Sequence, residues 1–277
     1  MSKEQDYVIP DLLTDTEWLQ NNLSNKDIRI VDCGYWEAYK RAHIPGAVGI
    51  PRDHYFKDPD TNRTFISNPE QFSREMTELG ISNNTLVVAY DDFGSLWASR
   101  LWWVLKYYGH HSVKVLNGGW NKWLSEGKQV TGVKPHIHKT KFDPVIDKGI
   151  LATAQQIMDI DRNNPEKIVF DVRSDAEYKG ENDRGNKRAG HIPGAKHLEW
   201  LNFVDKENSM IFKSAPEIAA LLAPLGITTD KEITTYCQGG IRAAHVFFVL
   251  ELLGYKNLRV YDGSFREWGN RQDTPIE

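Results

Sequence analysis

The sequence contains two cysteines, and one of them, Cys237, stands where its thiol could do chemistry. It ends a strand-like run, Ile233–Tyr236, and is followed by the loop sequence Gln238-Gly239-Gly240-Ile241-Arg242. Paired glycines let the backbone curl so that successive N–H groups point toward one centre. A helix that begins near Arg242 would add its unpaired N-terminal donors and the positive end of its dipole. Such a bowl favours the thiolate and would hold an anionic persulfide or an oxyanionic substrate.

Each residue of this loop has an expected part in the site. Gln238, Gly239, Gly240 and Ile241 should bind substrate mainly through backbone N–H groups, with the Gln238 side chain reaching the mouth. Arg242 could pair with a carboxylate such as Asp171 and brace the loop, or it could contact substrate. Both roles of Arg242 serve the site, and the sequence leaves them open.

Each cysteine also has a purely structural explanation, because most free cysteines are small buried packing residues. For Cys33, which follows Asp32 at the end of an early strand and has no glycine-rich loop, we expect that structural role. For Cys237 the glycine pair, the strand-to-helix junction and the loop arginine favour a reactive thiol. This interpretation requires a thiol that reacts readily and that solvent can reach.

The histidines indicate neither a metal site nor a general base. His136 and His138 have no cysteine or acidic cluster nearby at ligand spacing, so no metal is predicted. His43 and His191 occupy the same place in two repeated segments, which favours a scaffolding role. His245, one turn into the predicted helix, is expected to be a packing residue.

Internal repetition sets the domain organisation. His43-Ile44-Pro45-Gly46-Ala47 recurs as His191-Ile192-Pro193-Gly194-Ala195, and the segment 85–123 matches 232–268. Repeats of this length indicate duplicated domains rather than a solenoid. The region between them contains Pro, Gly and Lys without periodicity, which is typical of a linker. We therefore expect an N-terminal domain over 1–128, a linker over 129–148 and a C-terminal domain over 149–277.

Alternating strands and helices predict the α/β fold class for both units. The expected strands are Ile28–Val31, Leu86–Ala89 and Val113–Leu116 in the first unit, and Ile168–Phe170, Ile233–Tyr236 and Leu258–Tyr261 in the second. A helix is expected before the last strand of each unit, over Leu96–Tyr108 and Arg242–Leu253. This order predicts two mainly parallel sheets flanked by helices, with sites at the carboxyl ends of the strands.

Composition limits the function classes. The 277 residues carry a formal net charge of only -4, which argues against a general nucleic-acid or membrane binder. The N-terminus has no apolar run of signal-peptide length, and no stretch of about 18 apolar residues occurs. Two cysteines make a disulfide framework improbable, so a reducing, cytoplasmic setting is expected. The expected partners are therefore small molecules, with no nucleic acid and no membrane.

The loop and its flanking motifs resemble those of the rhodanese family of sulfurtransferases. The resemblance rests on the Cys-x-x-x-x-Arg loop, the two His-Ile-Pro-Gly-Ala segments and the ending Asp262 to Trp268. It extends over nearly the whole chain. It implies two tandem rhodanese-like domains of the thiosulfate sulfurtransferase type, of which only the C-terminal one is catalytic. In our internal alignment Asp92 falls opposite Cys237 and Trp97 opposite Arg242, so the first unit lacks both residues.

The resemblance implies a reaction in which thiosulfate gives its outer sulfur to Cys237 and cyanide or a thiol removes it, without a cofactor. Arg184 resembles by position an arginine that anchors the anionic end of substrate in the 3-mercaptopyruvate branch, although a solvated surface arginine explains it equally well. That branch has a serine where this chain has Gly239 and an arginine where it has Glu177, which favours thiosulfate. Thiosulfate enzymes, however, often carry cations in the loop, which is neutral here.

Two further alternatives belong to other classes. A cysteine-dependent phosphatase of the related fold resembles Cys-x5-Arg, but only four residues separate Cys237 from Arg242. The shorter loop suits a single sulfur atom better than a tetrahedral phosphate. A rhodanese-like module used only for binding would lack the nucleophile, which is true of the first unit and not of the second.

Overall fold

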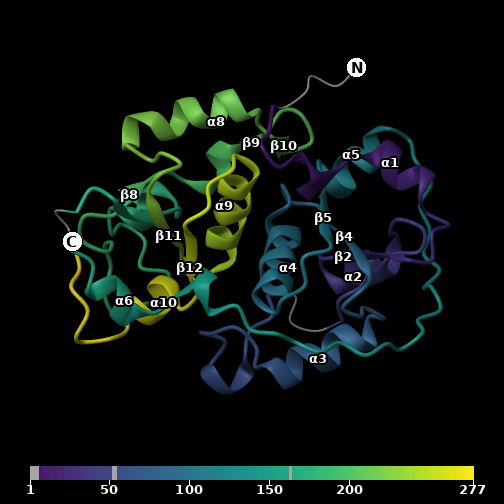
Figure 1. Cartoon of the computed structure of the whole chain (residues 1–277), viewed down its shortest axis with the longest axis horizontal. Coiled ribbons are helices and arrows are strands. Elements are labelled where there is room, and N and C mark those ends of the chain that lie inside the picture. The colour runs from purple at the N-terminus through teal and green to yellow at the C-terminus, as the bar shows by residue number, and fades with distance from the viewer. Residues whose placement is uncertain (1–5, 52–54, 162–163) are drawn as a thin grey trace.

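The protein was described by a computed structural model covering residues 6–51, 55–161 and 164–277. Its two halves contain five-stranded parallel sheets with equivalent strand orders, β1-β5-β4-β2-β3 and β6-β12-β11-β7-β8 (Figure 1). The first sheet comprises β1 (Leu13–Thr14), β2 (Ile28–Asp32), β3 (Val48–Gly49), β4 (Leu86–Tyr90) and β5 (Val113–Leu116). The second comprises β6 (Leu151–Ala152), β7 (Lys167–Asp171), β8 (Lys196–His197), β11 (Glu232–Tyr236) and β12 (Leu258–Tyr261). The predicted α/β class and duplication are confirmed.

Helices cover both sheets. The first half has α1 (Thr16–Asn21), α2 (Trp36–Arg41), α3 (Pro69–Glu78), α4 (Leu96–Tyr107) and α5 (Gly119–Ser125). The second half has α6 (Ala154–Met158), α7 (Asp175–Tyr178), α8 (Ala215–Leu222), α9 (Ile241–Leu252) and α10 (Ser264–Trp268), with a small antiparallel pair of β9 (Val204–Asp205) and β10 (Ile211–Phe212). The sequence predicted α4 and α9 to within one residue at each end. It did not predict the two-residue edge strands, because so short a run has no periodicity to read.

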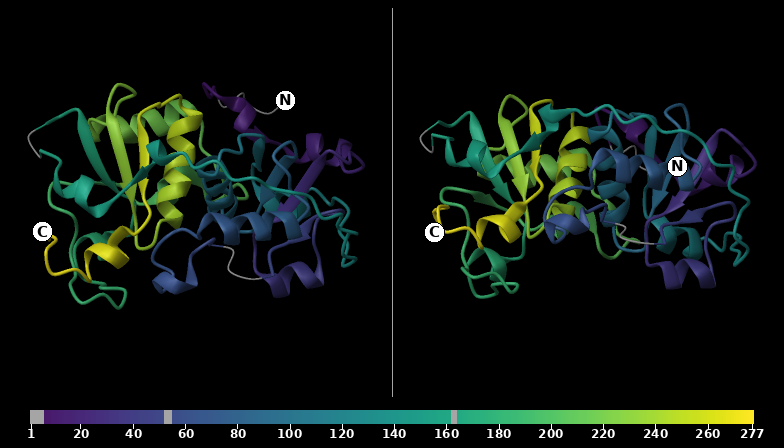
Figure 2. Two further views of the ribbon diagram at one scale, coloured as in Figure 1. Left: turned by 60° about the horizontal axis from the view of Figure 1, so that its bottom comes forward. Right: turned by 90° about the horizontal axis from the view of Figure 1, so that it is seen from below.

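The central helices of the two halves pack against each other. Figures 1 and 2 show α4 and α9 side by side between the two sheets, and they are in direct contact. Trp102 of α4 lies 4.9 Å from Phe248 and 6.1 Å from Phe247 of α9 between ring centroids. One apolar core therefore runs through both halves, with a smaller core on the outer face of each sheet. The aromatic residues of α4 hold the halves together and leave the loops of both sheets facing this junction.

The segment between the halves follows the first half closely. It is extended, with Thr131 bridged to His43 and the Phe142 side chain buried against Phe72. His136 and His138 are exposed on it. Over the described residues, no group of His, Cys, Asp and Glu could hold a metal ion, and no helix has the length and apolar character needed to span a membrane.

Candidate active site

Cys237 follows β11 directly, at the carboxyl end of the second sheet. Tyr236 at the end of β11 is in register with Asp171 at the end of β7, so the loop opens beside two central strand ends. The chain then turns through Gly240, whose φ of 83° lies in the left-handed region, and enters α9. Glycine adopts this conformation without the strain that a side chain would add. Because a glycine stands at the start of α9, no side chain caps its first N–H groups, which are left for an anion.

The turn that follows β12 braces this loop. The Cys237 N–H donates to Ser264 Oγ at 3.2 Å, and the Phe265 N–H donates to the Cys237 carbonyl at 2.9 Å. One residue further, the Arg266 N–H donates to the Gln238 carbonyl at 2.9 Å. A Cβ added to Gly240 would lie 2.4 Å from Asp262 Oδ1, a distance that real Cβ atoms do not reach. Glycine at this position is therefore required by close approach as well as by φ.

The structure buries the thiol completely, with 0% of Cys237 exposed. This differs from the sequence-based requirement that solvent can reach it. The cause is the bracing turn, whose Ser264 and Phe265 are themselves buried beside the cysteine. Gln238, Gly239, Ile241 and Arg242 are half-buried, so the loop borders solvent although its sulfur does not.

Arg242 braces the loop by pairing with a carboxylate, but the partner is Glu177. Its two terminal nitrogens donate to the two Glu177 oxygens at 2.6 and 2.8 Å. Burial raises the pKa of Glu177, but the hydrogen bonds and charge of Arg242 outweigh it and lower that pKa to about 2. Asp171, the partner expected from the sequence, is occupied by Arg173 at 2.6 Å. Arg173 lies two residues from Asp171 in the chain and reaches it locally, so Arg242 pairs elsewhere.

The segment between Tyr178 and His191 is longer than the matching segment between Tyr39 and His43 of the first half, and we call it the insertion. It lies against the Cys237 loop. Arg184 Nε is 3.9 Å from Glu177 Oε1, and just over half of the Arg184 side chain is exposed. Gln238 does not point freely into the mouth, because its amide exchanges two 3.1 Å hydrogen bonds with Asn186 of the insertion. The structure thus brings Arg184, Gln238 and Arg242 together around Glu177 and the loop.

The first half holds a carboxylate where the second holds its thiol. Tyr90 pairs with Asp32 as Tyr236 pairs with Asp171, so the residue opposite Cys237 is Asp91. Our sequence alignment assigned this place to Asp92, because it did not allow for one extra residue in the first loop. The predicted match of Trp97 with Arg242 holds, because each is the second residue of its helix, α4 or α9. Helix α4 begins five residues after Asp91, and α9 begins four residues after Cys237.

The buried Asp91 carboxylate shows what this type of loop binds. Its two oxygens accept four backbone hydrogen bonds of 2.7 to 3.0 Å, and the donors are the N–H groups of Phe93, Ser95, Trp97 and Ala98. Burial raises the pKa of Asp91 to about 6 although these hydrogen bonds act to lower it, so at neutral pH the inward amides encircle an anion of the chain itself. The equivalent loop of the second half has a cysteine in place of the aspartate and is one residue shorter.

Four side chains around the loop received no role of their own from the sequence: Asp262, Lys57, Arg100 and Arg266. Asp262 belongs to the motif that was noted, yet its contacts with Lys57 and Arg100 join residues 205 and 162 positions apart. Arg266 is exposed on α10, and its Nε is the nearest atom, at 4.0 Å, to a Cβ built on Gly239. The Asp262 to Trp268 ending was a signal for Asp262, whereas nothing local distinguishes Lys57, Arg100 or Arg266.

The residues expected to be structural are so placed. Cys33 is buried, and its burial raises the pKa of its thiol. His43 and His191 stack on Tyr39 and Tyr178, with centroids 4.1 and 3.7 Å apart.

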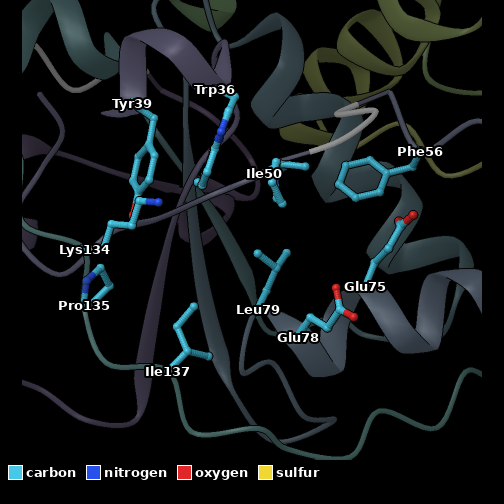
Figure 3. A pocket seen from close by; sticks show the side chains of 12 residues that line it. Trp36, Tyr39, Ile50, Phe56, Glu75, Glu78, Leu79, Lys134, Pro135 and Ile137 are labelled. Carbon is cyan, nitrogen blue, oxygen red and sulfur yellow. The ribbon is translucent and has the colours of Figure 1, made fainter. Parts of the chain in front are cut away.

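A separate cavity of about 270 Å³ lies in the first half, away from the Cys237 loop (Figure 3). Its lining comes from α2, β3, α3 and the linker and includes Trp36, Tyr39, Ile50, Leu79 and Ile137.

Comparison with known proteins places this arrangement in a family. Residues 15–126 and 153–271 each match the Rhodanese-like domain. The sulfur carrier protein TtuD of Thermus thermophilus is 40% identical over 282 residues, covering 98% of both chains. The thiosulfate sulfurtransferase of Corynebacterium glutamicum is 34% identical over 284 residues, covering 99% of this chain and 92% of its own.

Solved structures agree with this similarity. The anaerobic ergothioneine biosynthesis enzyme from Chlorobium limicola, in complex with trimethyl histidine, superposes with a TM-score of 0.85 at 25% identity, covering 96% of this chain and 70% of that one. A structure of EanB with ergothioneine covalently linked to a cysteine persulfide gives a TM-score of 0.85 at 26% identity over the same shares. With two family matches, a duplicated sheet and a cysteine loop at the second sheet's carboxyl edge, the chain belongs to the rhodanese family.

Proposed function

We propose that this chain is a thiosulfate sulfurtransferase that carries sulfane sulfur on Cys237. The observation that carries the proposal is the pair of equivalent loops, one closed around the Asp91 carboxylate and the other offering a thiol at the same place. Relatives named as a thiosulfate sulfurtransferase and as a sulfur carrier protein support the same chemistry. The N-terminal domain, over residues 1–128, is non-catalytic in this proposal because it lacks a thiol in its loop.

The reaction has two balanced steps. The Cys237 thiolate attacks the outer sulfur of thiosulfate, a sulfur–sulfur bond forms, and the bond to the sulfonate sulfur breaks as its electron pair leaves with sulfite. Cyanide or a thiolate then attacks the outer sulfur of the persulfide and takes it away as thiocyanate or as a new persulfide, which returns the Cys237 thiolate. The N–H groups at the start of α9 and the helix dipole stabilise the negative sulfur in both forms. A covalent intermediate of this kind gives ping-pong kinetics.

An anionic sulfur donor such as thiosulfate is supported by cations beside the loop. The loop itself is neutral, but Arg266 of α10 lies beside Gly239, and Arg184 of the insertion lies beside Glu177. Both side chains are exposed and can meet the sulfonate end of thiosulfate. The alternative donor is 3-mercaptopyruvate, for which the carboxylate would take the same cations.

Access to the buried thiol requires movement at the mouth. The buried Ser264 and Phe265 of the bracing turn lie beside the thiol, and the Gln238–Asn186 amide pair and the exposed Arg266 border the loop. Releasing the two neutral hydrogen bonds of the amide pair, which costs about 1 to 3 kcal/mol, would allow the loop to move relative to the bracing turn. The acceptor in this proposal is a small nucleophile or a protein thiol, in keeping with the sulfur carrier relative.

Intact-protein mass after separate incubation with thiosulfate and with mercaptopyruvate tests the proposal. We expect thiosulfate to add the mass of one sulfur atom, cyanide to remove it, Cys237→Ser to abolish it and Cys33→Ser to retain it. A wild-type chain that gains no sulfur from thiosulfate would overturn the proposal, and a chain that gains sulfur from mercaptopyruvate alone would favour the alternative donor. Turnover of p-nitrophenyl phosphate that disappears in Cys237→Ser would instead favour the phosphatase alternative.

A further inference from the structure

Three buried charged side chains join the N-terminal half to the Cys237 loop. Asp262 Oδ1 accepts from Lys57 Nζ and from Arg100 Nη1, both at 2.8 Å. Asp262 follows β12, Lys57 precedes α3, and Arg100 lies on α4. None of the three is more than 3% exposed. We call Lys57, Arg100 and Asp262 the interdomain cluster.

The interdomain cluster lies directly against the loop. Asp262 Oδ1 is the atom that blocks a side chain at Gly240, where the loop becomes α9. Lys57 also donates to the Asp262 carbonyl at 3.1 Å and to the Thr64 carbonyl at 2.9 Å. Two residues after Asp262, Ser264 holds the Cys237 N–H. Lys57 and Arg100 therefore fix both the carboxylate and the backbone of the turn on which the thiol's own amide depends.

The charges of the cluster do not cancel. Two cations face one carboxylate, and within the described part of the chain Arg100 Nη2 has no acceptor and Asp262 Oδ2 has no donor. Burying an ion costs several kcal/mol, and apolar side chains would hold an interface at least as well. The surplus positive charge therefore has no explanation in packing, but it suits a neighbour that becomes an anion.

The duplicated architecture provides an internal comparison. Arg100 is the fifth residue of α4 and His245 the fifth of α9, so each central helix sends an equivalent side chain across the interface. Arg100 reaches the turn beside the Cys237 loop, and His245 Nε2 lies 3.1 Å from the Gly94 carbonyl in the Asp91 loop. Burial lowers the pKa of His245 to about 3, so its contact is neutral at physiological pH. The Asp91 loop, which has no thiol, is therefore contacted by a neutral side chain, whereas the turn beside the Cys237 loop is contacted by the cations Lys57 and Arg100.

We propose that Lys57 and Arg100 are positioning residues of the Cys237 site, through which the N-terminal domain fixes the loop and supplies a positive charge that stabilises the sulfur anion. The inference rests on the proposed function in one respect: Cys237 reacts as a thiolate and carries the persulfide. It assigns to the domain without a nucleophile a direct part in the chemistry of its partner domain.

Electrostatics at the site support this role. Burial lowers the pKa of Lys57 to about 8; the charge of Arg100 acts in the same direction, while the charges of Asp262 and, least of all, Cys237 act against it. The other charged groups around the loop are Arg242 paired with Glu177, Arg173 paired with Asp171, and the exposed Arg184 and Arg266. The acids among them are salt-bridged, and arginines keep their charge, so Lys57 is the neighbour that titrates near neutral pH.

The pH dependence of Cys237 alkylation by the neutral reagent iodoacetamide tests the proposal. Lys57→Met should raise the midpoint of this profile by about one pH unit, which slows alkylation about tenfold below the midpoint, and Lys57→Arg should not. Lys106→Met is the matched control, because Lys106 of α4 forms a different interdomain ion pair, with Glu251 of α9 at 2.7 Å. It removes one interdomain cation away from the loop and should leave the midpoint unchanged.

The outcomes separate this inference from the proposed function. If wild type gains sulfur from thiosulfate but the midpoints of Lys57→Met and Lys106→Met stay equal, the inference fails while the proposed function stands. If Lys57→Met does not fold, Lys57→Gln, which keeps donors toward Asp262, takes its place. Misfolding of both would mean a structural role only and would also overturn the inference. Failure of wild type to gain sulfur defeats both.

Discussion

Changing each of the two neighbouring glycines of the Cys237 loop to alanine should affect stability differently. We expect Gly240→Ala to destabilise the fold and Gly239→Ala to leave it nearly unchanged. In Gly240→Ala the new Cβ meets Asp262 Oδ1 at 2.4 Å and the Asp262 carbonyl at 3.0 Å, at a φ of 83°. In Gly239→Ala the nearest of the surrounding atoms is the end of the flexible Arg266 side chain, 4.0 Å away. Gly239 also has no positive φ, so the second change meets neither obstacle.

The loss of stability in Gly240→Ala depends on how far the backbone and Asp262 can adjust to the new Cβ. The left-handed backbone costs a residue with a Cβ about 1 to 2 kcal/mol. Asp262 cannot withdraw freely, because Lys57 and Arg100 both hold the oxygen that the new Cβ meets. Weakening that buried cluster adds roughly 1 to 3 kcal/mol, since complete loss of a buried partner costs about 3 to 5 kcal/mol. We expect a total near 3 kcal/mol, or a decrease in Tm of roughly 6 to 12 °C.

Thermal unfolding and sulfur loading together test this reasoning. Gly240→Ala should unfold earlier and gain little or no sulfur from thiosulfate by intact mass, because the displaced turn no longer holds the Cys237 N–H. Gly239→Ala should keep a Tm within about 2 °C of wild type, as expected for a change without steric conflict. Equal losses in both variants, or a Gly240→Ala chain as stable as wild type, would refute the close approach described here.

Three other predictions concern charge around the loop. Glu177→Gln should lower the free energy of unfolding by about 2 kcal/mol at pH 7. Burial raises the pKa of Glu177, but Arg242 outweighs burial and lowers that pKa to about 2. Such a carboxylate stabilises the fold at a pH above its usual pKa and loses that effect as the pH falls toward 2. Urea unfolding at pH 7 and pH 3 should therefore show the difference from wild type shrinking, and a constant difference would contradict it. Arg266→Gln should raise the KM for thiosulfate several-fold with little change in kcat, while Lys256→Gln at an exposed distant position should not; equal KM values would remove Arg266 from the donor site. His245→Gln should leave the pH profile of kcat/KM unchanged, since burial already keeps that histidine neutral with a pKa of about 3, and a shifted profile would show that it titrates with the reaction.

Local patterns were sufficient for the longer strands, for the two central helices and for the place of Cys237 between β11 and α9. Alternating runs and the glycines after them defined β11 and α9 to within a residue, and the loop sequence located Cys237 between them. Duplication was visible because two copies of one pattern lie in the same chain. These features depend on residues close in sequence, where backbone geometry and periodicity act directly.

Tertiary structure alone decided which charges meet. Arg242 pairs with Glu177 across 65 positions, and Arg100 reaches Asp262 across 162, so neither partner could be read from spacing. The strand register cannot be read from the sequence, and it shows that the carboxylate matching Cys237 in position is Asp91 rather than Asp92. Burial of the thiol likewise depends on a turn that packs over it from beyond the next strand. Chain folding brings these groups together through packing of whole elements, and packing is a property of the assembled surfaces rather than of any one segment.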